Sequence, residues 1–485
     1  MDNARTIVKN SFFLYASHLI TRIVNIVYIG IFARKLGIEV LGDFGLVTTL
    51  YFYFVTVVEF GLTPLFMREI ATDKAGSGKK FFNILIVRYL FSGLSFLVIF
   101  PIQGFLNYPP ELKLLIIIYF INIFFIPIQS TYGALFKGHE KYEFTSIITL
   151  VSNLIGTAVN LLIIFMGGTL KEIILVSIPL NIIPVILYFI FGRKLNIDYE
   201  FKLDLRLIGK FLKKGLVFFL AGIFFQIYLR TDLIILSKLS TKKSVGLYNS
   251  AFRIFGFLLV MLNILVQSTF PTMSRLYKNN FEKFKKLFYG LLRILLFVFF
   301  PLVIFSSIFS KDIIILIFGK EFISAHLALI PLLWTFFIIA FNTPISLSLV
   351  TTKYEHFTMY TALLGAILNI ILDLYLIPKY DILGAGLATI IPRLVNTTIL
   401  MSLFYKYFFK IEWVKIIKIV FLNIILGIGL YFFREYNWVI VLSGYLILYS
   451  LLIFIFKIIT DYEISLIKGL VLDFKDRISG GMVSL

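Results

Sequence analysis

Long runs of apolar residues, separated by short polar joints, follow one another along almost the whole chain. About 20 apolar residues in a helix cross the roughly 30 Å hydrocarbon core of a bilayer. Lipid satisfies no backbone polar groups, and these runs are too long and too uniformly apolar for barrel strands, so we expect helices. The pattern predicts fourteen membrane-spanning helices, at residues 11–33, 41–65, 81–106, 112–136, 144–166, 171–191, 215–237, 246–270, 287–309, 325–350, 356–377, 383–405, 413–433 and 438–459.

The composition supports a polytopic membrane protein. Hydrophobic residues make up 60% of the 485 residues, whereas soluble domains are about 45–50% apolar. The chain has no cysteine, and its four histidines are scattered, so we expect neither a disulfide framework nor a metal site. The first apolar run is too long for the core of a cleavable signal peptide, so we expect it to remain as the first span.

Basic residues lie mainly in short loops on one predicted side of the membrane. The formal net charge is +20, but this placement argues against nucleic acid as a partner. With the N-terminus inside, 29 Lys and Arg residues fall on the inner segments and 11 on the outer loops. Because inner loops carry the excess of basic residues, we expect a protein of the cytoplasmic (inner) membrane with both termini in the cytoplasm.

A weak internal repeat predicts the domain organisation. Residues 33–44 at the end of the first span resemble residues 236–248 at the end of the seventh, and further matches follow in the same order. Six helices separate corresponding spans, so the repeat is parallel. We therefore expect a six-helix bundle at 1–192, a basic cytoplasmic linker at 193–214, a second six-helix bundle at 215–410, and two additional helices with a cytoplasmic tail at 411–485.

Six arginines fall inside the predicted spans. They are Arg22, Arg88, Arg230, Arg253, Arg293 and Arg393. A charge at the centre of a bilayer costs at least roughly 2.5 kcal/mol, so such residues seldom face lipid. Several of them together predict a water-filled, cationic central cavity, and a cationic cavity suits an anionic cargo.

Four of these arginines are the strongest candidates to line the cavity and bind substrate: Arg22, Arg230, Arg253 and Arg393. Gln226 lies one helical turn from Arg230 on the same face and falls near Arg22 in the repeat, so it joins the substrate-binding candidates. Arg88 and Arg293 lie closer to span ends, where a long side chain reaches the interface. Whether either lines the cavity stays open at this point, and Arg88 is kept as a substrate-binding candidate.

The intramembrane acids are Glu59, Asp232 and Asp373. A buried carboxylate that binds H+ or Na+ would couple transport to an ion gradient, but for each acid alone we favour pairing with one of the arginines. The chain has no G-x-x-x-x-G-K-[ST] loop, and no paired-carboxylate or Ser/His/Asp arrangement suits an aqueous site. We therefore expect a transporter rather than an enzyme, with no cofactor besides a coupling ion.

Four segments carry a resemblance to a known family: 230–238, 245–253, 315–322 and 382–389. They resemble the polysaccharide biosynthesis (Wzx-type) flippases of the multidrug/oligosaccharidyl-lipid/polysaccharide (MOP) exporter superfamily. The resemblance implies a fold similar to that of the MATE and MurJ transporters. It also implies a polyprenyl-(pyro)phosphate-linked oligosaccharide as cargo, moved by alternating access, with membrane lipid and polysaccharide assembly proteins as partners. In this family, cavity arginines are thought to attract phosphate, which matches the placement of the four central arginines.

Three alternatives stay open. A MurJ-type lipid II flippase also needs a cationic cavity. A MATE-type ion-coupled drug exporter usually handles organic cations, and six intramembrane arginines against three acids oppose that cargo. A membrane scaffold without transport activity would bury its arginines against protein partners.

Overall fold

The computed structural model describes residues 20–74, 76–352 and 354–455, and all of their regular secondary structure is helical. A first helix covers residues 20–36. The next helices are α2 (Ile38–Glu59), α3 (Leu62–Thr72), α4 (Ser77–Leu106), α5 (Pro110–Phe120), η1 (Ile121–Phe124), α6 (Ile126–Gly138), α7 (Tyr142–Phe165), α8 (Leu170–Gly192) and η2 (Arg193–Leu195). The remainder are α9 (Leu205–Leu239), α10 (Lys242–Asn279), α11 (Phe281–Ile308), α12 (Ser310–Phe318), η3 (Lys320–Ala325), α13 (His326–Val350), α14 (Glu355–Tyr407), α15 (Trp413–Phe432) and α16 (Trp438–Ile455).

The helical segments confirm a multi-pass membrane protein. Ten of them, within the described residues, are long and apolar enough to cross a membrane. The predicted spans 356–377 and 383–405 both fall in α14, which consists of two helices joined at a kink where the backbone of Asp381 is non-helical (φ 51°). The first predicted span begins outside the described residues, and the last two correspond to shorter apolar helices. The total of fourteen spans therefore stays a prediction.

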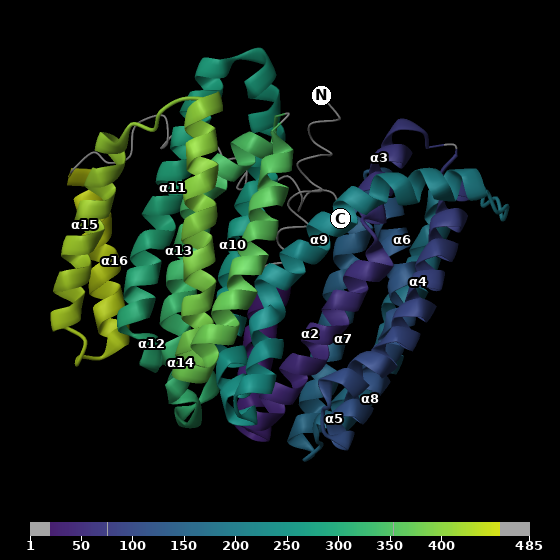
Figure 1. Cartoon of the computed structure of the whole chain (residues 1–485), viewed down its shortest axis with the longest axis horizontal. Helices are drawn as coiled ribbons and strands as arrows, with labels where there is room; N and C mark the ends of the chain where they lie inside the picture. The colour runs from purple at the N-terminus through teal and green to yellow at the C-terminus, as the bar shows by residue number, and fades with distance from the viewer. Residues whose placement is uncertain (1–19, 75, 353, 456–485) are drawn as a thin grey trace, which may run out of the picture. The chain divides into compact units, whose positions relative to one another are not determined.

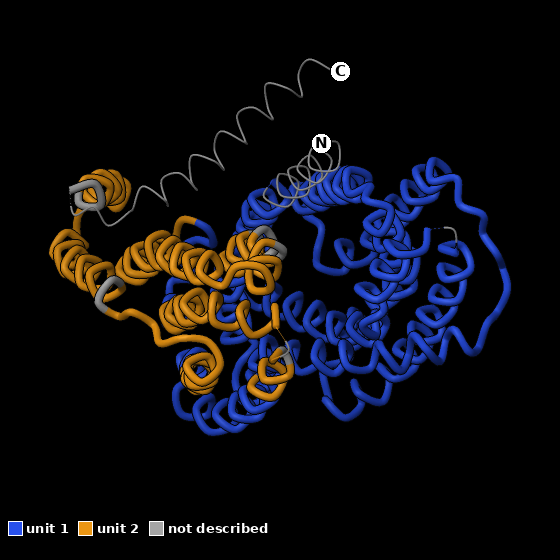
Figure 2. Tube along the Cα trace, turned by 90° about the horizontal axis from the view of Figure 1, so that it is seen from above, with its two compact units in different colours: residues 1–257, 317–328, 362–388 blue, residues 258–316, 329–361, 389–485 orange. Residues whose placement is uncertain are grey.

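The chain divides into two compact units, coloured blue and orange in Figure 2. Unit 1 comprises residues 1–257, 317–328 and 362–388, and unit 2 comprises residues 258–316, 329–361 and 389–485. These units do not follow the predicted boundaries at 192, 215 and 410, because α9 and the first turns of α10 pack with the N-terminal helices. The division into two six-helix bundles with a linker stays a prediction.

In unit 1, helices α2 and α10 cross at unusually close range. A Cβ atom on Gly42 would lie 2.9 Å from the backbone nitrogen of Gly246, and a Cβ atom on Gly246 would collide with the carbonyl oxygen of Ile38. Beside this crossing, the Asn249 side chain donates a hydrogen bond to the carbonyl oxygen of Leu41 at 2.7 Å. Only glycine permits such a backbone approach, so these residues fix where the two helices touch.

The other end of unit 1 holds an apolar core made by α3, α4, α6 and α9. Its fully buried members include Leu62, Phe66, Leu135 and Phe136. Figure 1 shows that α9 bends along its course; its first turns lie against α3 and α4, and it also packs beside α2. The core therefore positions the start of α9, while the later turns of α9 carry the candidate site.

Unit 2 is built around α11, whose side chains pack against α13, α15 and α16. Phe300 stacks on Phe337 with ring centres 4.4 Å apart, and Tyr449 donates a hydrogen bond to the carbonyl oxygen of Phe297 at 2.8 Å. Helices α15 and α16 each begin with a tryptophan, a residue that favours the membrane–water interface. Their many exposed apolar side chains are the surface expected of helices that contact lipid.

Candidate functional site

Three of the predicted arginines come together in unit 1. Arg230 on α9 and Arg253 on α10 repel each other electrostatically, and Arg22 on helix 20–36 repels both. The carbon centre of the Arg230 guanidinium lies 4.5 Å from the ring centre of Phe52. In the part of the chain that the structure describes, none of the three makes an ion pair. We call Arg22, Arg230 and Arg253 the arginine cluster.

The arginine cluster has an aromatic and hydroxyl lining. Arg230 also faces the ring of Phe252 at 5.8 Å, and Arg253 faces the ring of Phe44 at 5.5 Å. Aromatic faces attract a cation without neutralising its charge, so the guanidinium edges keep their capacity to bind an anion. The Nε atoms of Arg230 and Arg253 are buried and lack a hydrogen-bond acceptor within the described residues. The arrangement is chemically suited to a phosphate group.

Tyr53 links α2 to the helix that carries Arg230. Its hydroxyl lies 2.8 Å from the Thr231 hydroxyl and donates to the carbonyl oxygen of Gln226 at 3.3 Å. The Gln226 side chain is buried at its Oε1 atom. The sequence prediction missed the roles of Tyr53 and Phe52, because 26 tyrosines and 55 phenylalanines give no signal that separates site aromatics from packing ones.

Arg393 and Arg293 belong to unit 2. Arg393 follows a proline inside α14 and is partly buried. Arg293 donates from Nε to the carbonyl oxygen of Tyr289 on its own helix at 3.4 Å. A substrate-binding role for Arg393 stays a prediction.

Arg88 is fully buried in an ion pair. Its NH2 atom lies 3.2 Å from the Glu59 carboxylate and donates to Thr63 at 2.6 Å, while NH1 donates to Thr131 at 2.8 Å. Glu59 also accepts hydrogen bonds from the hydroxyls of Thr63 and Ser130. For Glu59 the structure thus shows pairing with an arginine, the interpretation favoured from the sequence for each acid alone. Arg88 has its partners inside unit 1, and a role in substrate binding stays a prediction.

Asp232 on α9 and Asp373 on α14 face each other within unit 1. Both side chains are almost fully buried, and the two carboxyl groups are close enough to share a proton. Tyr248 donates its hydroxyl to Asp232, while no donor from the described residues satisfies either oxygen of Asp373. Two carboxylates at this range repel each other strongly unless a proton or a cation lies between them. Sequence reasoning named both acids but gave no sign that they meet.

A buried amide lies beside the Asp232–Asp373 pair. Asn369 is one helical turn before Asp373 on the same helix, and it donates to the carbonyl oxygen of Ala388 at 3.3 Å. Its own Oδ1 atom is buried without a donor from the described residues. The pair and this amide oxygen therefore concentrate oxygen acceptors in an apolar surrounding, which favours the binding of H+ or of a hard cation.

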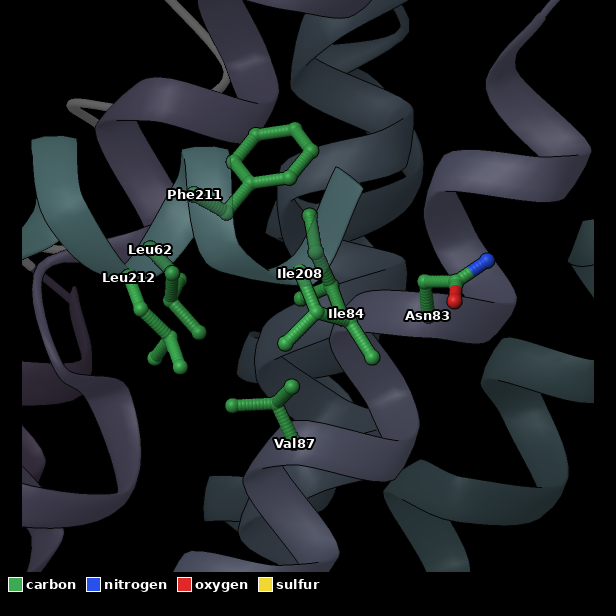
Figure 3. A pocket seen from close by; sticks show the side chains of 7 residues that line it. All are labelled: Leu62, Asn83, Ile84, Val87, Ile208, Phe211 and Leu212. Carbon is green, nitrogen blue, oxygen red and sulfur yellow. The ribbon is translucent and has the colours of Figure 1, made fainter. Parts of the chain in front are cut away.

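A small pocket of unit 1 lies elsewhere. Figure 3 shows its lining, which comes from α3, α4 and the start of α9: Leu62, Asn83, Ile84, Val87, Ile208, Phe211 and Leu212. None of the six arginines lines it. The pocket belongs to the packing of the start of α9 rather than to the arginine cluster.

Comparisons with known proteins agree with this architecture. The model of the family described as polysaccharide biosynthesis protein matches residues 7–277, and the MatE model matches residues 218–375. A probable low-salt glycan biosynthesis flippase, Agl15 of Haloferax volcanii, is 21% identical over 444 residues, which cover 88% of this chain and 90% of that protein. The teichuronic acid biosynthesis protein TuaB of Bacillus subtilis is 24% identical over 280 residues, 57% of this chain and 56% of TuaB.

Solved structures show the same fold. The lipid II flippase MurJ in an inward closed conformation superposes with a TM-score of 0.76 at 18% identity, covering 92% of this chain and 98% of MurJ. An inward-facing MATE family multidrug transporter of the MOP superfamily gives a TM-score of 0.64 at 15% identity, covering 81% of this chain and 96% of that transporter.

Proposed function

Because the chain belongs to the polysaccharide biosynthesis protein family, we propose that it translocates a polyprenyl-(pyro)phosphate-linked oligosaccharide across the cytoplasmic membrane. The protein is a membrane flippase of the MOP superfamily and not an enzyme. We further propose that the chain crosses the membrane fourteen times, with both termini in the cytoplasm. Its partners would be polysaccharide assembly proteins.

The observation that carries the proposal is the arginine cluster. It gathers three guanidinium groups without an acidic counterion in the described residues, inside a protein of the membrane. A guanidinium offers a bidentate fork to phosphate oxygens and stays protonated. Arg22, Arg230 and Arg253 would hold the phosphate while the polyprenyl tail stays in the bilayer, because hydrocarbon favours the tail and opposes the charged head group.

The Asp232–Asp373 pair is the proposed coupling site for H+ or Na+. Its two carboxyl groups require a shared proton or a cation. The binding of that ion would therefore depend on the ion gradient across the membrane. Glu59 is the weaker candidate because Arg88 and two hydroxyls already engage its carboxylate.

Movement of the cargo would proceed by alternating access. The Gly42–Gly246 crossing would close the side that the predicted topology puts outside, leaving the predicted cavity open to the cytoplasm. Release of the cargo would require this crossing to open.

A transport assay tests the proposal. The purified protein is reconstituted in vesicles with a lipid-linked oligosaccharide, and transbilayer movement is measured by access of an added glycosidase to the sugar. Arg230→Ala should reduce movement at least tenfold, and Arg230→Lys should restore part of it because a point charge lacks the fork. Arg434→Ala, at an exposed loop position, is the matched control. Movement by Arg230→Ala at the control rate would reject the phosphate site.

The same vesicles separate the alternative cargoes. A lipid II flippase would move lipid II and leave the lipid-linked oligosaccharide in place. A drug exporter would move organic cations instead, although the unneutralised arginine cluster opposes a cationic cargo.

A further inference from the structure

The first turns of α9 and the residue segment before them carry a basic surface. Its members are Lys202, Arg206, Lys210, Lys213 and Lys214, all exposed. We call these five residues the α9 basic surface. It belongs to unit 1 and lies far from the arginine cluster: along α9, Lys213 and Arg230 are 17 residues apart, which corresponds to a helix length of about 25 Å.

The opposite face of this part of α9 is fixed in the protein core. Ile208, Phe211 and Leu212 line the pocket of Figure 3 together with Leu62 and Val87. On a helix, residues three and four apart share a face, so anchoring one face fixes the direction of the other. The row Arg206, Lys210 and Lys213 therefore lies on the exposed face of α9.

The segment that precedes α9 is held on α4. The Asn83 side chain donates to the carbonyl oxygen of Lys202 at 2.9 Å and accepts from the backbone nitrogen of Asp204 at 2.8 Å. Lys79 lies 2.7 Å from the Asp204 carboxylate, which also caps α9 by accepting from the backbone nitrogen of Leu207. The α9 basic surface is thus presented by a docked segment, which reduces the entropy that binding would cost.

Acidic residues neutralise only part of this surface. Glu69 on α3 lies 3.5 Å from Lys210 and 3.5 Å from Lys214. Lys202, Arg206 and Lys213 make no ion pair with any residue in the described ranges. Three cations therefore remain available to an anion outside the protein.

Large apolar side chains are exposed beside these cations. Phe201 is 77% exposed, Leu203 54% and Leu205 72%. After Lys214 the exposed side chains of α9 become apolar, beginning with Leu216 and Val217. Basic residues next to exposed aromatic and aliphatic residues, at the start of a membrane-spanning helix, are the pattern of a surface that lies at the lipid head-group level.

We propose that the α9 basic surface binds the head groups of anionic phospholipids, with Phe201, Leu203 and Leu205 inserted among the acyl chains near the interface. The lipid phosphates would contact Lys202, Arg206 and Lys213, which lack acidic partners. This lipid is a resident of the bilayer rather than the transported cargo, so the proposal does not depend on what the arginine cluster binds.

Lipid titration of the full-length protein in a neutral detergent tests the proposal. Native mass spectrometry measures the dissociation constants of phosphatidylglycerol and phosphatidylcholine at low and high salt. The test variant combines Lys202→Gln, Arg206→Gln and Lys213→Gln. The control combines Lys171→Gln, Lys311→Gln and Lys320→Gln, which removes the same charge from exposed positions predicted to lie on the other side of the membrane.

The wild type and the control should bind phosphatidylglycerol at least tenfold more tightly than phosphatidylcholine. Each basic residue near a lipid surface contributes about 1 kcal/mol, or about fivefold in affinity, so the test variant should lose tenfold or more. High salt should weaken the binding of phosphatidylglycerol to the wild type, and it should change the affinity of the test variant for this lipid little.

A second measurement locates the apolar residues. Because the chain has no cysteine, a single nitroxide at Phe201→Cys reports its surroundings directly. In vesicles it should be relaxed by oxygen, which concentrates in lipid, more than by a water-soluble nickel complex. The proposal is overturned if the nickel complex dominates, or if the test variant and the control lose equal affinity. It is also overturned if the wild type shows no preference for phosphatidylglycerol.

Discussion

Replacement of Arg88 separates a structural role from a substrate-binding role for this residue. Arg88→Met keeps the length and apolar volume of the side chain but removes its charge. The change deletes the ion pair to Glu59 and the hydrogen bonds to Thr63 and Thr131. We expect a destabilised protein, because Glu59 would then keep its charge with only hydroxyl partners.

The magnitude follows from the geometry. Removing one partner of a buried ion pair lowers the free energy of unfolding by about 3–5 kcal/mol. The Glu59 side chain retains 27% exposure and two hydroxyl donors, so the lower end, about 3 kcal/mol, applies. Glu59→Gln in the same protein removes the uncompensated charge, so the double variant should be less stable than wild type by only about 1 kcal/mol. The coupling is the loss of Arg88→Met plus the loss of Glu59→Gln minus the loss of the double variant, so it should be more than about 2 kcal/mol.

The assay is reversible unfolding in mixed micelles, followed by helix circular dichroism, for the wild type, both single variants and the double variant. Transport by the same four proteins is measured in vesicles below the unfolding range. If Arg88 is structural, the double variant should recover both stability and transport. A fully stable Arg88→Met protein that transports nothing would refute this reasoning and would assign Arg88 to the substrate.

Three further predictions follow from the geometry. Gly246→Leu should prevent close approach of α10 to α2 and reduce transport at least tenfold in the vesicle assay; transport at the wild-type rate would show that the crossing is not needed. Asp373→Asn should remove the dependence of transport on the H+ or Na+ gradient, measured with ionophores; an unchanged dependence would exclude the Asp232–Asp373 pair. The hydrogen bond from Lys79 lowers the pKa of Asp204, so its contribution to stability is present at neutral pH and is lost as pH falls through that lowered value; Asp204→Asn should flatten the acid side of the stability profile.

The class of the protein could be predicted from the sequence because hydropathy acts residue by residue. Long apolar runs demand helices in lipid, whatever their neighbours are. The same residue-by-residue reasoning identified the arginines and acids of the spans as candidates, because a charged side chain in hydrocarbon has a high free-energy cost. The segments 230–238 and 245–253 carried the family resemblance, which the match over residues 7–277 supports.

The grouping of these charges could not be predicted. In a soluble helix, apolar periodicity shows which face is buried, but a membrane helix is apolar on the lipid side and on the packing side alike. The sequence therefore favoured pairing of Glu59 with one of the arginines but did not show that Arg88 is its partner, and Arg88 was kept among the substrate-binding candidates. Nothing in the sequence around Asp232 and Asp373, 141 residues apart, indicated that their carboxyl groups meet.

The sequence by itself thus determined that the chain is a helical membrane protein with charges placed inside its spans. Only the tertiary structure decided which of those charges neutralise each other and which stay without a counterion. The physical reason is that the position of a charged residue along the chain shows whether the charge lies in a span and is costly to bury. Whether an opposite charge or a hydrogen-bond partner offsets that cost depends on distances between helices. Arg88 pairs with Glu59 and is part of the packing. Arg230 and Arg253 lie against aromatic rings with Arg22 nearby, and none of the three has an acidic partner in the described residues.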